Sequence, residues 1–319
     1  MRPIRWLSAG LCLLFAAQSS AQGHGFASGF DVQSGLESLY RINLATGAAV
    51  RVGAFGFRDV DGLAFDRDGR LYGAADGSSE SGGISDLLIR IDTTTGAGSL
   101  VVPLTGLAGL GPGLGGQLDY GLAIGCDGKA WLSSDTLGHV WEVDRSSGSV
   151  RRVIESGPLL SGLAARGPFL FGVSIAPDEA LYRIDTRSLA IERVGGLNLD
   201  NRIYDVGLDF DAEGRLWATL DYLVPPDGAP VVFRNDLAEL DPASGRVLRR
   251  IPISGAGTGI NTVQMEGLAI APPECSNFEA GAPPASSTPQ VVPAGDWPTW
   301  LLIALALGGL GLLRLRHQH

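Results

Sequence analysis

A short phrase built on Gly-Leu recurs along this chain, and its spacing constrains the fold more than any other feature. Five copies occur at intervals of about 40 to 60 residues, beginning at Gly62, Gly121, Gly162, Gly207 and Gly267. Each of the first four is followed nine or ten residues later by an aromatic residue: Tyr72, Trp131, Phe171 and Trp217. The fifth runs into Pro272 instead, while a matching aromatic segment, Gly25 to Asp31, stands near the other end of the chain. The pattern therefore predicts a repeat fold that closes on itself.

A second repeated signature is typical of hairpin turns. An apolar stretch leads into Asp or Asn and, in four of its five copies, into Ser or Thr followed by Gly; the five acidic or amide residues are Asn43, Asp92, Asp144, Asp185 and Asp241. Such side chains bond back to the backbone, and the glycine supplies the positive φ. Leu189 takes the place of that glycine in one copy, where the pattern does not predict the same turn. Each repeat then contains four short strands, as in one blade of a β-propeller.

The number of blades follows from how the ends combine. The segment from Gly267 supplies the first strand of the last blade, and residues from about 24 to 54 supply its other three strands. The sequence thus predicts an all-β, five-bladed propeller over residues 22–272, closed by pairing of its N- and C-terminal strands. Six blades are the alternative, because two repeats are long enough to contain an additional one. The extra length is rich in Gly or Pro, at 107–116 and 222–235, which favours loops and a count of five.

These motifs resemble those of secreted propellers with YVTN- or NHL-like repeats. Residues 62–73 read GLAFDRDGRLYG and residues 88–96 read LIRIDTTTG, and the resemblance extends roughly from Gly25 to Pro272. It implies the architecture. It does not imply an activity, because this group includes binding proteins, scaffolds and several hydrolases on one fold.

The N-terminal residues predict export. Arg2 and Arg5 precede an apolar run from Trp6 to Ala17, and small residues around Ala21 follow, as in a secretory signal peptide covering residues 1–21.

The C-terminal residues predict attachment or sorting at a membrane. Residues 273–296 are rich in Pro, Ala and Ser and are expected to form an extended linker. Residues 297–319 contain an apolar run and then basic residues, the pattern of a transmembrane segment. Val292, Pro293 and Trp297 resemble the motif of IPTL-CTERM and PEP-CTERM sorting tails. That resemblance implies processing by an exosortase-type membrane enzyme, and an ordinary membrane anchor is the alternative. The protein is therefore expected either anchored in the inner membrane or sorted to the cell surface or extracellular matrix.

The net charge limits which partners are expected, and the cysteines raise the question of a disulfide. The formal net charge is −10, so a grip on nucleic-acid phosphates is not expected. Cys126 and Cys275 form an even pair in an exported domain, which favours a disulfide. They follow the first strands of two blades that are not neighbours in a ring of five, and this separation argues against the bond. The sequence therefore leaves open whether Cys126 and Cys275 pair.

In an antiparallel blade, successive connections between strands lie alternately on the two faces of the propeller. The turns between strands one and two and between three and four lie on one face, which we call the tight-turn face. The longer segments at 77–86, 104–116 and 224–235 lie on the other, the long-loop face, where binding is expected. Two sets of carboxylates also belong to the long-loop face. Those at the starts of first strands are Asp61, Asp119, Asp205 and Glu266, and those at the ends of second strands are Asp31, Asp76, Asp135 and Asp221.

Convergent carboxylates need a cation, an arginine or protons to relieve their repulsion. Ca²⁺ takes about six to eight oxygen ligands of this kind. The first set predicts a Ca²⁺ site at the mouth of the central channel, and the second a ligand-binding rim. In the competing interpretation, these residues cap strand ends or pair with arginines such as Arg58 and Arg202, and the ring is interrupted at Leu160 and Ser161.

Catalytic motifs are sparse. The predicted propeller contains only His24 and His139, and it lacks a Gly-x-Ser-x-Gly nucleophile elbow. We therefore expect a non-catalytic, exported binding or scaffold propeller that recognises a surface protein, glycan or small ligand. The alternative is a Ca²⁺-dependent, lactonase-like hydrolase that uses the carboxylates at the channel mouth.

Overall fold

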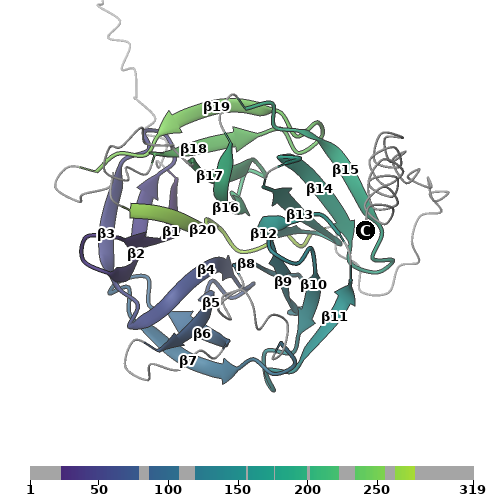
Figure 1. Cartoon of the computed structure of the whole chain (residues 1–319), viewed down its shortest axis with the longest axis horizontal. Helices are drawn as coiled ribbons and strands as arrows, with labels where there is room; N and C mark the ends of the chain where they lie inside the picture. Colours follow the sequence, from purple (N-terminus) through teal and green to yellow (C-terminus); the bar gives the residue numbers. More distant parts are fainter. Residues whose placement is uncertain are drawn as a thin grey trace, which may run out of the picture. The chain divides into compact units, whose positions relative to one another are not determined.

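The computed structural model describes residues 23–78, 86–107, 119–155, 157–175, 177–199, 202–222, 234–255 and 263–276. All regular elements in these ranges are β-strands, arranged in five antiparallel sheets of four strands each. Each sheet is one blade, and the blades surround a common centre (Figure 1). Five blades are confirmed within the described residues, and the alternative of six is not.

Four blades are built from consecutive strands, given from the inner strand outward. Blade 1 contains β4 (Phe57–Phe65), β5 (Leu71–Ser78), β6 (Leu87–Ile91) and β7 (Gly98–Pro103). Blade 2 contains β8 (Tyr120–Ile124), β9 (Ala130–Ser134), β10 (Val140–Val143) and β11 (Val150–Ile154). Blade 3 contains β12 (Leu160–Arg166), β13 (Phe169–Ser174), β14 (Ala180–Asp185) and β15 (Ile191–Gly196). Blade 4 contains β16 (Ile203–Phe210), β17 (Leu216–Tyr222), β18 (Arg234–Leu240) and β19 (Val247–Pro252).

The fifth blade joins the two ends of the propeller. Its strand order is β20 (Val263–Ala269), β1 (His24–Asp31), β2 (Leu36–Asn43) and β3 (Ala49–Ala54). Phe26 pairs with Ala269 and Asp31 with Val263, in antiparallel register. The predicted closure by terminal strands is therefore confirmed, and it removes the free sheet edges that an open ring would expose.

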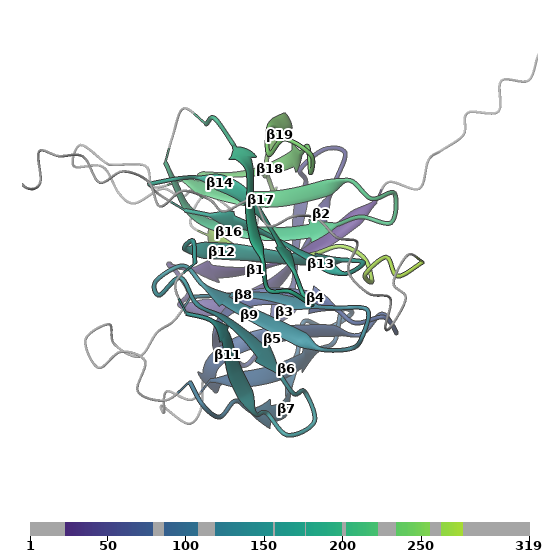
Figure 2. The same ribbon diagram turned by 90° about the vertical axis from the view of Figure 1, so that its right-hand side faces the viewer.

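The recurrent glycines are explained by how closely the inner strands approach one another. A Cβ atom on Gly62 would lie 2.5 Å from the backbone nitrogen of Leu122 in the next blade. The same clash recurs around the ring, and on Gly267 a Cβ would lie 2.2 Å from the carbonyl oxygen of Asp61. Only glycine permits this backbone approach. In the side view, β8, β12 and β16 lie between the outer strands β19 and β7 (Figure 2).

Aromatic residues fill the spaces between blades, as their constant offset predicts. Trp131 of blade 2 packs in one cluster with Leu163 and Leu170 of blade 3. Phe171 of blade 3 makes an edge-to-face contact with Phe210 of blade 4, with ring centroids 5.1 Å apart. These positions therefore form core, and they are not a ligand-stacking belt.

The turns between third and fourth strands have the predicted Asx geometry. Thr94 and Thr95 donate their backbone N–H groups to the Asp92 carboxylate at 2.7 and 3.0 Å. Gly96 then has a φ of 79°. In the copy without glycine, Leu189 adopts a φ of 59° and still bonds to the Asp185 carbonyl. The turn is retained there because its side-chain and backbone bonds hold a residue that would otherwise avoid this conformation.

The structure decides the pairing of the two cysteines, which the sequence left open. Cys126 and Cys275 form a disulfide, with their Cα atoms 5.5 Å apart. The sequence argument placed Cys275 at the end of its own blade, but residues 271–276 continue past β20 across the tight-turn face. The Gly167 N–H donates to the Glu274 carbonyl, so this segment also reaches the β12–β13 turn. It thereby brings Cys275 beside the β8–β9 turn, where Cys126 lies.

Several predicted features lie outside the described residues. They are the signal peptide at 1–21, the linker beyond Ser276, the segment at 297–319 and the motif at Val292, Pro293 and Trp297. In the part of the chain that the structure describes, no helix is long and apolar enough to cross a membrane.

Candidate functional site

A pocket of about 760 Å³ opens at the long-loop face, where the inner strands begin. We call it the mouth pocket. Four carboxylate residues line it, together with three aromatic residues and one arginine: Glu37, Asp59, Asp119, Glu266, Phe30, Phe57, Tyr204 and Arg58. Beneath it, the glycine ring leaves a void of only about 10 Å³ between the inner strands. A ligand can therefore occupy the mouth, but it has no route through the channel.

Two β-bulges set the carboxylates of the inner strands. In blade 5, Glu266 and Gly267 together lie opposite the single residue Ser28 of β1. In blade 1, Asp61 and Gly62 lie opposite the single residue Ala74 of β5. Such bulges redirect side chains and often occur beside functional sites. Here they interrupt the simple alternation of the strands at the residues that carry the acids.

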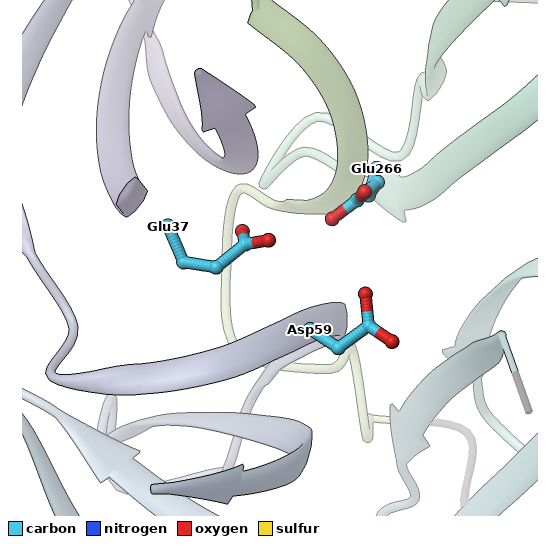
Figure 3. A group of neighbouring side chains, drawn as sticks. All are labelled: Glu37, Asp59 and Glu266. Carbon is cyan, nitrogen blue, oxygen red and sulfur yellow. The ribbon is translucent and has the colours of Figure 1, made fainter. Parts of the chain in front are cut away.

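Three carboxylates converge at the mouth pocket from three different strands. Glu37 of β2, Asp59 of β4 and Glu266 of β20 each place one oxygen within 4.8 Å of the other two. The three carboxylates point into a common space (Figure 3). We call Glu37, Asp59 and Glu266 the mouth triad. Asp59 also forms a second group, with Asp61 and Asp119, within the same distance.

The backbone of Asp59 is itself unusual. Its φ is 49°, a conformation that non-glycine residues rarely adopt and that costs on the order of 1–2 kcal/mol. The rest of β4 must offset that cost. This backbone conformation places the Asp59 carboxylate where it belongs to both acidic groups.

Burial and mutual repulsion raise the pKa values at this site. Burial, with a contribution from the Asp59 charge, raises the pKa of Glu37 to about 8. Burial, and then the charge of Glu37, raises the pKa of Glu266 well above its usual range. Burial, and next Asp59, also raises the pKa of Asp119. Without a cation, the site therefore holds protons that ordinary carboxyl groups would release at neutral pH.

Two oxygens of the mouth triad are buried and have no hydrogen-bond partner among the described residues. They are Oε2 of Glu37 and Oε2 of Glu266. Glu37 is 8% exposed and Glu266 is 6% exposed, so bulk water does not solvate them well. A buried polar atom without a partner costs about 1–3 kcal/mol. Two such oxygens lie in one space here, where either protons or a bound cation would satisfy them.

No described basic residue neutralises the buried triad members. Neither Glu37 nor Glu266 forms an ion pair within the described ranges. Arg58 and Arg202, the arginines of the competing interpretation, are exposed and likewise pair with no described carboxylate. By contrast, Asp66 and Asp211 on the tight-turn face do have arginine partners.

The other predicted cation ligands are distributed unequally. Asp61 accepts a hydrogen bond from the Tyr120 N–H at 3.2 Å and belongs to the second acidic group. Asp205 accepts bonds from the Ser161 hydroxyl and the Val206 N–H, and it belongs to neither group. Its bonds to the neighbouring strand β12 and to its own strand β16 indicate a structural contribution in addition to its charge.

The predicted rim residues do not form one surface. Asp31 caps the β1–β2 turn, accepting bonds from the Gln33 N–H and the Ser34 hydroxyl. Asp135 is buried beside Thr136, and burial followed by the Asp119 charge raises its pKa to about 7. Asp221 is fully buried, and burial followed by the Asp205 charge raises its pKa to about 8. The side chain of Asp76 lies outside the described set.

Sequence reasoning missed Glu37 entirely and did not assign Asp59 a ligand position. Glu37 starts a third strand, whereas the sequence analysis examined only first and second strands. Asp59 stands two residues before Asp61, and its contribution depends on a backbone conformation that no motif predicts. A search for acids at the starts of all strands on the long-loop face would have found Glu37.

Known proteins add little beyond the fold. No family model and no curated protein matches this chain. Three similar solved structures are a nidogen/laminin complex, TolB from Acinetobacter baumannii and a protein of unknown function from Bacteroides caccae. Their identities are 14%, 13% and 10%, with TM-scores of 0.47, 0.45 and 0.49. The matches cover 79%, 78% and 78% of this chain, and 99%, 67% and 98% of the other chains. These values carry no argument about function, and the propeller assignment rests on the strand pairing itself.

Proposed function

We propose that this chain is an exported, non-catalytic binding propeller that holds a divalent cation such as Ca²⁺ in its mouth triad. The observation that carries this proposal is the convergence of Glu37, Asp59 and Glu266, in which Glu37 and Glu266 each have a buried oxygen without a hydrogen-bond partner among the described residues. The donor set consists only of carboxylate oxygens, which suits a hard cation and not a soft transition metal. Such an ion would displace the protons that these carboxyl groups otherwise hold because their pKa values are raised.

The described ends of the propeller favour display of the mouth pocket. The Leu44 N–H bonds to the Gly23 carbonyl, at the tight-turn face where β2 ends. Ser276 follows the disulfide on the same face. Both described ends of the propeller therefore lie on the face opposite the mouth pocket. Fractionation of producing cells and mass spectrometry of the mature C-terminus test export, anchoring and processing.

Calcium titration tests the cation site. In the purified propeller we expect saturable heat by calorimetry and a higher melting temperature. At a Ca²⁺ concentration of about 100 times Kd, the added stability is about 2.7 kcal/mol. For a domain of this size that corresponds to about 5–10 °C.

Two matched variants separate the site from general charge effects. Glu266→Gln removes one ligand charge while keeping the side-chain shape, and it should abolish both the heat and the melting shift. Asp68→Asn neutralises an exposed acid on the tight-turn face, whose ion pair among the described residues is with Arg70, and should change neither. Absence of calcium-dependent heat and melting shift in the wild-type protein would refute the proposed site.

The alternative of a calcium-dependent hydrolase uses the same carboxylates. It requires turnover in addition to cation binding. A screen of lactones and phosphotriesters, with and without calcium, distinguishes the two classes. Calcium-dependent turnover that Glu266→Gln abolishes would replace the binding proposal with the hydrolase.

A further inference from the structure

The mouth pocket is far larger than a single ion requires. Its volume of about 760 Å³ falls in the range of small-molecule sites. All members of the mouth triad line it, so it opens directly onto the proposed cation. A hard cation binds about six to eight oxygens, more than three carboxylate groups readily supply. Oxygens from a ligand in the pocket can complete this set.

The wall of the pocket differs chemically from its acidic base. Phe30 and Phe57 are partly buried along it, and Tyr204 is 47% exposed. Aromatic side chains of this kind present flat apolar surface, with a polar handle in tyrosine. Gln264 and Thr136 add polar groups to the same lining. This combination suits a ring that has both an apolar face and hydroxyl groups.

Arg58 determines the expected charge of the ligand. It is exposed, lines the pocket and forms no ion pair with a described residue. A guanidinium group binds a carboxylate through two parallel hydrogen bonds. An arginine with no ion pair among the described residues, beside a bound divalent cation, therefore favours an anionic oxygen ligand over an amine, which both positive centres would repel.

We infer that the mouth pocket binds a sugar acid, whose carboxylate and hydroxyl oxygens contact the bound cation while Arg58 pairs with the carboxylate. The aromatic wall packs against the ring. This inference rests on the cation site proposed above, and it specifies the ligand class of that site.

The test uses D-galacturonate as the probe, with its methyl ester as the neutral counterpart. Binding to the wild-type protein is measured by calorimetry and saturation-transfer NMR, in excess calcium and in EDTA. We expect galacturonate to bind in calcium. Removing calcium, or esterifying the carboxylate, should weaken binding about tenfold or more, as expected for loss of a charge-assisted contact.

Variants identify the contributions of individual residues. Arg58→Gln should weaken galacturonate binding about tenfold while leaving calcium affinity unchanged. Tyr204→Ala should likewise weaken the sugar and spare the ion. Arg67→Gln is the matched control, because Arg67 is exposed just after the same strand but on the tight-turn face. It should change neither measurement.

The outcomes separate this inference from the proposal on which it rests. Calcium binding without galacturonate binding overturns the sugar-acid assignment and leaves the cation site intact. Equal galacturonate affinity in calcium and in EDTA also overturns the sugar-acid assignment. Spermidine serves as a cationic probe, and tighter binding of spermidine than of galacturonate overturns the assignment as well. Absence of calcium binding removes the cation site, and the ligand assignment with it.

Discussion

The pKa of Glu37 gives a direct test of the electrostatics at the mouth triad. An ordinary glutamate has a pKa of 4.5, and in the folded protein burial followed by the Asp59 charge raises it to about 8. A carboxyl group with a raised pKa binds its proton more tightly in the folded state. The resulting stability is fully present below pH 4.5 and is lost as pH rises through about 8. The cation-free protein should therefore become less stable as the pH increases from 5 to 7.

The size of the effect follows from the difference between these two pKa values. Each pH unit between the two pKa values costs about 1.4 kcal/mol, so Glu37 contributes a loss of about 2–3 kcal/mol over this interval. For a domain of this size, the melting temperature falls by about 5–10 °C. Asp221 and Asp135, with pKa values of about 8 and about 7, act in the same direction in both wild type and variant.

Glu37→Gln isolates the contribution of this side chain. Glutamine resembles the protonated acid, so the variant should match the wild type at pH 5 and melt about 5–10 °C higher at pH 7 in EDTA. Differential scanning calorimetry across this pH range measures the difference. Glu213→Gln, at an exposed turn on the tight-turn face, is the control and should follow the wild-type curve. Parallel curves for Glu37→Gln and wild type would refute the electrostatic argument.

Three further predictions concern the fold and its chemistry. Cys126→Ser, or reduction of the wild-type protein, should lower the free energy of unfolding by about 2–4 kcal/mol; denaturant titration measures this, and no change would mean that the cross-link adds nothing to an already closed ring. Gly121→Ala places a Cβ 2.4 Å from the Ser161 carbonyl oxygen and should lower the free energy of unfolding by about 1–3 kcal/mol or more. Gly196→Ala, whose nearest neighbouring atoms are 3.6 Å away, is the control and should lower it by less than about 1 kcal/mol. Equal melting temperatures of the two variants would contradict the close packing of the inner strands. The hydrolase screen should give no calcium-dependent turnover of lactones, and product formation above the EDTA blank is the contrary result.

Much of the architecture could be read from local sequence because each blade repeats the same physical requirements. Glycine is needed wherever neighbouring inner strands approach, as at Gly62 and Gly267. Aromatic residues are needed where blades pack, as at Trp131. These requirements recur at fixed spacing, so periodicity identified the blades and the closure by β1 and β20.

The sequence left the disulfide undecided, because the bond depends on the path of the chain beyond the last repeat and not on a repeated pattern. Cys275 lies beyond the last repeat, where no periodic constraint sets the direction of the chain. Contacts of Glu274 with the β12–β13 turn carry it across the tight-turn face to Cys126. Blade adjacency, which counted against the bond, therefore does not apply to a residue that belongs to no blade.

The sequence by itself determined the five blades, the pairing of the terminal strands and the face on which acidic residues gather. Those properties depend on spacing and strand parity, which are local. The tertiary structure decided which acids meet: Glu37, Asp59 and Glu266 come from three strands, and bulges together with a positive φ direct them. It also decided which of them lack partners. Charge repulsion and burial depend on how close these residues lie in space. Because the residues are far apart in the chain, they come close together only when the ring closes.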